Sequence, residues 1–169
     1  MSAAGRKGAL ARGDKLPEFS SRDEAVVALA AEKDAAVASL LSDRQLSPDI
    51  ALDFSSDSLL RLERWYFERV SLRRFFGMVR AADPEVLARW CAFYFGEVVV
   101  RNLDGAAWVV EEFPFVPERY TIGVRHGMLT MNLASFYEKL HHPKNKKHDS
   151  LWRTYEHYFA RNPNVTITF

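Results

Sequence analysis

The first two thirds of the chain carry apolar residues at helical spacing, which predicts a helical N-terminal half. Ser21 and Glu24 form a capping-box pattern at the start of the first helix, which extends to about Asp43. A second helix follows the cap candidates 55–57 and begins near Leu59.

The segment from about residue 84 to 103 is apolar on nearly every side. Asp83 followed by Pro84 is a strong helix start, because aspartate caps and proline suits the first helical position. A helix without a polar face is predicted to be buried at the centre of the fold. The β-branched run 98–100 favours a strand instead. Gly96 inside this helix indicates a close contact with another part of the backbone.

Beyond residue 105 the apolar positions alternate, which predicts a small antiparallel meander with a turn at His126–Gly127. We expect its strands at 106–113, 120–124 and 128–131. A short helix follows the cap candidate Asn132, and a last helix follows Asp149 or Ser150.

The last five residues alternate strictly: Val165, Ile167 and Phe169 are separated by threonines. This pattern predicts a terminal strand that joins the sheet near Trp108 and Ile122. A terminal strand at the sheet edge is a candidate interaction surface, because strand addition is a common recognition mode. The alternative is a strand that only stabilises the fold.

The predicted fold class is therefore α+β, with the central helix packed on the sheet and with C-terminal helices and a terminal strand. Residues 21–169 form one domain. Residues 1–20 are rich in glycine and charge and are expected to be a disordered tail that proteases remove.

The composition indicates the cellular compartment of the protein but says little about its function. The 169 residues include 23 Lys+Arg and 22 Asp+Glu, so the total charge predicts neither a nucleic-acid partner nor an acidic surface. The single cysteine, Cys91, lies in an apolar run and is expected to be a buried, inert thiol. No secretory signal and no membrane-spanning apolar stretch is recognised, which favours the cytosol.

Two groups of polar residues are candidate sites. Glu97 and Arg101 lie one turn apart in the most apolar helix and predict either a buried ion pair or an acid–base pair in an enzyme pocket. The interaction candidates Lys144, Lys146 and Lys147 form a basic loop that is suited to phosphate or RNA. The nearby histidines lack zinc-site spacing, so no metal and no cofactor is predicted.

Three short stretches resemble a loose set of small uncharacterised bacterial α+β proteins. They are a D-F-S-x-x-S-L helix start at residues 53–59, an F-G-E-x-x-x-R-N-L helix end at 95–103, and a tryptophan-containing strand at 106–109. Some members of this set are assigned as immunity proteins of polymorphic toxin systems. The resemblance implies helices packed on a small antiparallel sheet, and it brings no catalytic residues.

No catalytic motif is recognised, so the function expected first is a non-catalytic cytosolic protein-binding module, for example an immunity or accessory protein. One alternative is a hydrolase or nucleotide-handling enzyme that uses Glu97 and Arg101. Another is a nucleic-acid accessory factor that uses the basic tail and the Lys144–Lys147 loop, which the balanced charge disfavours. The partner is expected to be another protein, and the sequence gives no expectation of the oligomeric state.

Overall fold

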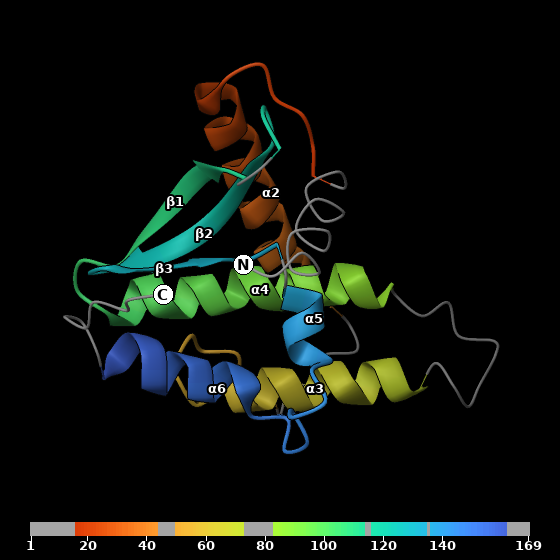
Figure 1. The fold of residues 1–169 in the computed structure, drawn as a ribbon. Helices are drawn as coiled ribbons and strands as arrows, with labels where there is room; N and C mark the ends of the chain where they lie inside the picture. The colour runs from red at the N-terminus through yellow and green to blue at the C-terminus, as the bar shows by residue number, and fades with distance from the viewer. Residues whose placement is uncertain (1–15, 44–49, 73–82, 114–115, 135, 162–169) are drawn as a thin grey trace.

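The computed structural model describes residues 16–43, 50–72, 83–113, 116–134 and 136–161 (Figure 1). Its elements in chain order are α2 (Arg22–Leu41), α3 (Ser58–Leu72), α4 (Pro84–Asn102), β1 (Ala107–Glu112), β2 (Tyr120–His126), β3 (Leu129–Asn132), α5 (Phe136–Leu140), α6 (Ser150–Thr154) and the π-helical η1 (Tyr155–Ala160). The predicted α+β class is confirmed.

Helix α4 is the centre of the molecule, as predicted. It contacts α2, α3, α5 and the first two strands, and Figure 1 shows it between the sheet and the pair formed by α3 and α6. Asp83 caps it by accepting a hydrogen bond from the Glu85 amide at 2.9 Å. The β-branched residues Val98 and Val99 are helical and fully buried, because burial on all sides of α4 outweighs their strand preference.

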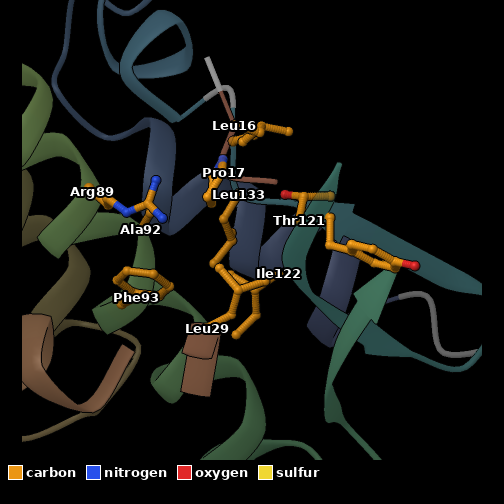
Figure 2. Close-up of a pocket in the computed structure, with 11 residues that line it drawn as sticks. Leu16, Pro17, Leu29, Arg89, Ala92, Phe93, Thr121, Ile122 and Leu133 are labelled. Carbon is orange, nitrogen blue, oxygen red and sulfur yellow. The ribbon is translucent and has the colours of Figure 1, made fainter. Parts of the chain in front are cut away.

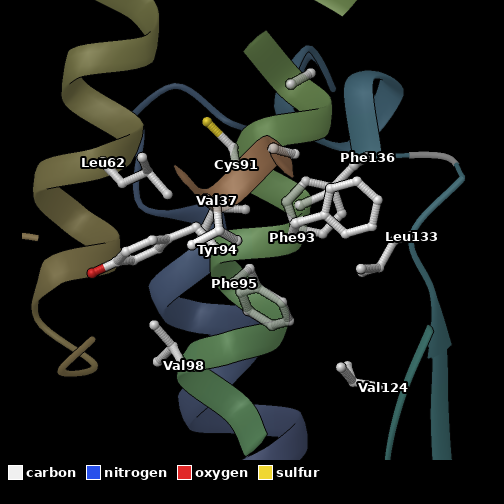
Figure 3. Close-up of a cluster of buried hydrophobic side chains, with 14 of the residues drawn as sticks. Val37, Leu62, Cys91, Phe93, Tyr94, Phe95, Val98, Val124, Leu133 and Phe136 are labelled. Atoms are coloured by element: carbon white, nitrogen blue, oxygen red, sulfur yellow. The ribbon is translucent and has the colours of Figure 1, made fainter. Parts of the chain in front are cut away.

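Helix α4 has no polar face, so side chains of its neighbours pack against it on all sides. In Figure 3, Tyr94 points toward Leu62 of α3, whereas Val124 of the sheet lies on the far side of α4. Phe95 contacts Phe136 of α5 and Phe159 of η1, with ring centroids 5.5 and 5.9 Å apart. Each neighbour of α4 therefore contributes side chains to one continuous core.

The sheet is an antiparallel meander in the order β1-β2-β3, as predicted. Its inner face pairs Trp108 with Val124, and Figure 1 shows helix α2 beside this sheet. The opposite face carries an ion pair between Arg125 and Glu111. The expected turn is one residue off, because His126 still belongs to β2 and the turn begins at Gly127, with φ of 58°.

Residues 16–19, which the sequence assigned to the tail, lie against the sheet. Glu18 forms an isolated antiparallel bridge with Arg119 and pairs with its guanidinium at 2.9 Å. Phe19 donates its amide to the Glu118 carbonyl at 3.2 Å. The Leu16 carbonyl accepts from the Arg119 guanidinium, and the Phe19 ring lies edge-on to Tyr120. The glycine content of the tail did not indicate this docked segment. Residues 1–15 lie outside the described residues.

Two predicted helix caps differ in detail. Ser21 accepts from the Glu24 amide at 3.2 Å, but the Glu24 carboxylate bonds Ser20 rather than completing the box with Ser21. Asp149 stands at the N-cap of α6 without capping it. Its carboxylate pairs with Arg153 at 2.9 Å instead. The predicted terminal strand 165–169 lies outside the described residues.

Candidate functional site

The three short stretches 53–59, 95–103 and 106–109 meet in space. Phe54 precedes α3, Arg101 lies in the last turn of α4 and Trp108 is the second residue of β1. The Phe54 ring stacks on Tyr94, and the Trp108 indole lies against Gly96, both in the C-terminal half of α4. The Arg101 guanidinium lies 3.6 Å from the centre of the Phe54 ring, which is a cation–π contact. The motifs are thus parts of one packed joint.

Glu97 lies at the centre of this joint and is 9% exposed. Its Oε1 accepts from Lys33 Nζ of α2 at 3.0 Å and from Trp108 Nε1 of β1 at 3.1 Å. Its Oε2 accepts from Arg101 Nε at 2.9 Å. We call Lys33, Glu97, Arg101 and Trp108 the Glu97 cluster. The predicted pair with Arg101 is present, and the cluster ties α2, α4 and β1 together.

Gly96 makes room for this arrangement. A Cβ atom built on Gly96 would lie 2.0 Å from Cη2 of Trp108, so only glycine lets the indole lie on α4. The close contact inferred from the sequence is therefore made by a side chain rather than by backbone.

The charges of the cluster keep Glu97 ionised. Burial alone would raise the pKa of Glu97, but the hydrogen bonds and positive charges of Lys33 and Arg101 outweigh it and lower that pKa. A carboxylate with three donors and a lowered pKa is poorly suited to act as a general acid at neutral pH.

Phe54 closes the joint from the other side in a left-handed conformation, with φ of 60°. Its amide donates to Tyr94 Oη at 2.8 Å, and its carbonyl accepts from Asn102 Nδ2 at 2.8 Å. Its ring stacks on Tyr94 with centroids 4.8 Å apart. These contacts compensate for a backbone conformation that costs a non-glycine residue about 1 kcal/mol or more.

A second buried carboxylate, Glu63 of α3, was not singled out from the sequence. It is fully buried, accepting from Asn145 Nδ2 at 2.6 Å and from the Leu151 amide at 2.8 Å. The signal was present: Glu63 follows Leu59 by four residues and precedes Tyr66 by three, which places it on the apolar face of α3.

Glu63 and Asn145 fix the loop 141–149, which we call the lysine loop. Asn145 is buried, and its Nδ2 also donates to the Leu140 carbonyl at 2.8 Å. The predicted interaction residues Lys144, Lys146 and Lys147 flank it and are exposed. A buried anchor thus holds the loop that carries them.

Two histidines of the lysine loop contact aromatic side chains of α3. The ring of His148 stacks on Phe67 of α3 at 3.9 Å between centroids, and His141 Nε2 lies 2.8 Å from Tyr66 Oη. Within the part of the chain that the structure describes, no group of three or more His, Cys, Asp or Glu side chains is placed to hold a metal ion. Cys91 is buried, and burial raises the pKa of its thiol.

Three cavities lie among the described residues at a distance from the Glu97 cluster. One, of about 20 Å³, lies between Leu16, Leu29 and Ile122 and has room for little more than a water molecule (Figure 2). A second, of about 300 Å³, is lined by Arg89 and Tyr137 among others. The third lies beside the lysine loop. Neither Glu97 nor its partner Arg101 lines any of the three, so these cavities provide no pocket at the pair.

Comparison with protein families gives a match over most of the described structure. The model of the family described as uncharacterised protein YwmA matches residues 31–159. This chain belongs to the YwmA family. The match to YwmA includes the Glu97 cluster, Glu63 and the lysine loop, and it ends before residue 165.

Searches of curated proteins and of solved structures gave no match. Among the described residues, no helix combines the length and the apolar character needed to cross a membrane.

Proposed function

We propose that this chain is a non-catalytic protein-binding module of the cytosol, of the immunity or accessory kind, that binds an acidic protein surface through its lysine loop. The observation that supports this proposal is the anchor beneath the loop. Lys144, Lys146 and Lys147 are exposed, while Asn145 between them is buried against Glu63.

The anchor matters because it fixes the loop before binding. A mobile basic loop loses conformational freedom when it binds, and that loss reduces affinity. Here the hydrogen bonds of Asn145 and the stacking of His148 on Phe67 have already ordered the backbone. Ordered positive charges also favour encounter with an acidic partner and select against basic ones.

A protein partner suits the surroundings of the loop better than a nucleic acid. Proteins that bind single strands offer exposed aromatic rings on which bases stack. Near the loop, the ring of Phe67 is instead stacked by His148, and Tyr66 is buried. The carboxylates of Glu138 and Asp149 also flank the lysines in sequence, which disfavours a continuous phosphate contact.

The enzyme alternative loses support from the bonding of Glu97. All three of its donors come from the protein itself, and its pKa is lowered rather than raised. A group with these properties stabilises the joint of α2, α4 and β1.

The test is capture of a partner by the purified chain, followed by reconstitution with that partner in pure form. We expect the Lys146→Glu/Lys147→Glu variant to weaken binding by about tenfold or more, because two attractive charges become repulsive. The matched control is Arg64→Glu/Arg161→Glu, which reverses two exposed charges outside the loop.

Binding that is weakened by salt, resists nuclease and is lost only in the lysine variant supports the proposal. Equal binding by both variants contradicts it. Loss of the captured material on nuclease treatment supports the nucleic-acid alternative instead.

A further inference from the structure

Lys139 lines a cavity between α5, the lysine loop and α6, and its ammonium group has no ion-pair partner among the described residues. The cavity measures about 420 Å³, within the lower range of small-molecule sites. Its polar lining includes Glu138, Lys139, His142, Lys144, Ser150 and Arg153.

Lys139 is partly buried and has no carboxylate beside it in the part of the chain that the structure describes, which is unusual for a cation. Its Nζ contacts Met131 Sδ at 3.7 Å, and a thioether is no counter-ion. Burial lowers the pKa of Lys139 to about 8, and the more distant charge of Glu63 opposes this only in part. Buried charges are normally paired, because desolvation is costly without an opposite charge.

The other charged groups add to the excess of positive charge. Lys139, Lys144 and Arg153 are three cations of the lining. The carboxylates of Glu138 and of Asp149, which pairs with Arg153, balance two of them and leave a surplus of one positive charge. The guanidinium of Arg153, a lining residue, is held by Asp149 at 2.9 Å. An anion with several oxygen acceptors, such as a phosphate group, suits these cationic donors, and the hydroxyl of Ser150 supplies a neutral donor.

We propose that this cavity binds a small phosphate monoester, with Lys139 as the counter-charge of the phosphate and with Lys144, Arg153 and Ser150 as further donors. This site goes beyond the protein-binding function proposed above, because it lies on the α5 side of the loop and does not use Lys146 or Lys147. The volume exceeds that of a phosphate ion, so a small organic group is accommodated beside the phosphate.

The experiment is calorimetric titration of the full chain with inorganic phosphate and with glycerol 2-phosphate, with acetate as a monoanionic control. We expect the monoester to bind more tightly than inorganic phosphate, and acetate to bind least. Lys139→Met is expected to weaken monoester binding by about tenfold or more. Lys147→Met, the same change on the lysine loop outside the cavity, is expected to leave it unchanged.

Proton uptake gives a second readout that a loosely held surface ion would not produce. Because the pKa of Lys139 is about 8 in the free protein, a bound dianion raises it and binding takes up protons near that pH. Titration at this pH in two buffers of different ionisation enthalpy measures the uptake, which Lys139→Met is expected to abolish.

Arg153→Gln tests the contribution of a second cation of the lining, and near-ultraviolet circular dichroism checks that each variant is folded. Absence of binding by either phosphate compound at millimolar concentration overturns the proposal, as does equal binding by the parent and a folded Lys139→Met variant. Tighter binding of inorganic phosphate than of the monoester overturns the monoester assignment and makes free phosphate the ligand. The Lys146→Glu/Lys147→Glu variant is expected to keep monoester binding, so the two proposals can fail separately.

Discussion

Glu97 and Glu63 are both buried carboxylates on apolar helices, yet their surroundings differ in kind. Glu97 accepts from two cations and an indole, and its pKa is lowered. Glu63 accepts from a side-chain amide and a backbone amide, and burial raises its pKa. The burial of Glu97 is compensated by positive charges, whereas the burial of Glu63 is compensated by neutral hydrogen-bond donors.

The difference matches what each carboxylate holds in place. The Glu97 cluster joins regular elements that also pack through the core, so the charges add to an existing interface. Glu63 accepts from the Asn145 side chain of an irregular loop and from the Leu151 amide in the first turn of α6. The first amides of a helix have no partner within the helix, so a side-chain acceptor must satisfy them. A buried carboxylate can therefore either strengthen the packing between helices and strands or accept hydrogen bonds from donors that secondary structure leaves without a partner.

The largest effect is expected from Glu63→Ala. The change leaves Asn145 Nδ2 and the Leu151 amide buried without this acceptor, at about 1–3 kcal/mol for each donor. Urea denaturation should show a loss in the free energy of unfolding of this order. Hydrogen exchange of the Leu151 amide should also accelerate. Glu63→Gln keeps one acceptor oxygen and should lose less free energy of unfolding. Equal stability of the alanine variant and the parent would contradict the role of Glu63 as an anchor.

Glu97→Ala should lower the free energy of unfolding by less than Glu63→Ala does. Breaking a fully buried ion pair costs about 3–5 kcal/mol, but solvent around the half-exposed Arg101 reduces this to roughly 2–3 kcal/mol. Trp108 loses the acceptor of its Nε1, so a change in tryptophan fluorescence should accompany the loss of stability. The control is Arg101→Ala, which removes only the exposed partner and is expected to have the smaller effect.

The two carboxylates also explain what the sequence could predict. Arg101 follows Glu97 by one helical turn, so a local pattern was enough to find this pair. Lys33 and Trp108 come from other elements, and their contacts with Glu97 depend on how α2 and β1 pack on α4. The helices and the meander follow local periodicity, which is why the fold class was predicted correctly.

Glu63 shows where such patterns stop being informative. Its partners Asn145 and Leu151 are more than 80 residues away, in the lysine loop and at the start of α6. The apolar positions around Glu63 place it on a buried face, but they do not say what satisfies it. The docking of residues 16–19 beside Arg119 is likewise long-range, and composition alone assigned those residues to the tail.

The smallest effect is the dependence of stability on pH, and it should have opposite signs for the two carboxylates. The pKa of Glu97 lies below its ordinary value of 4.5, so the contribution of Glu97 is present above that value and is lost as the pH falls through the lowered pKa. The pKa of Glu63 lies above 4.5, so its contribution is fully present below that value and is lost as the pH rises through the raised pKa. Urea denaturation of the parent, Glu97→Gln and Glu63→Gln between about pH 3 and pH 7 measures both. On acidification, the stability lost in Glu97→Gln relative to the parent should shrink, and the stability lost in Glu63→Gln should grow. If both differences change in the same direction, the two carboxylates are not distinguished by charged and neutral partners, and the contrast between the joint and the anchor is wrong.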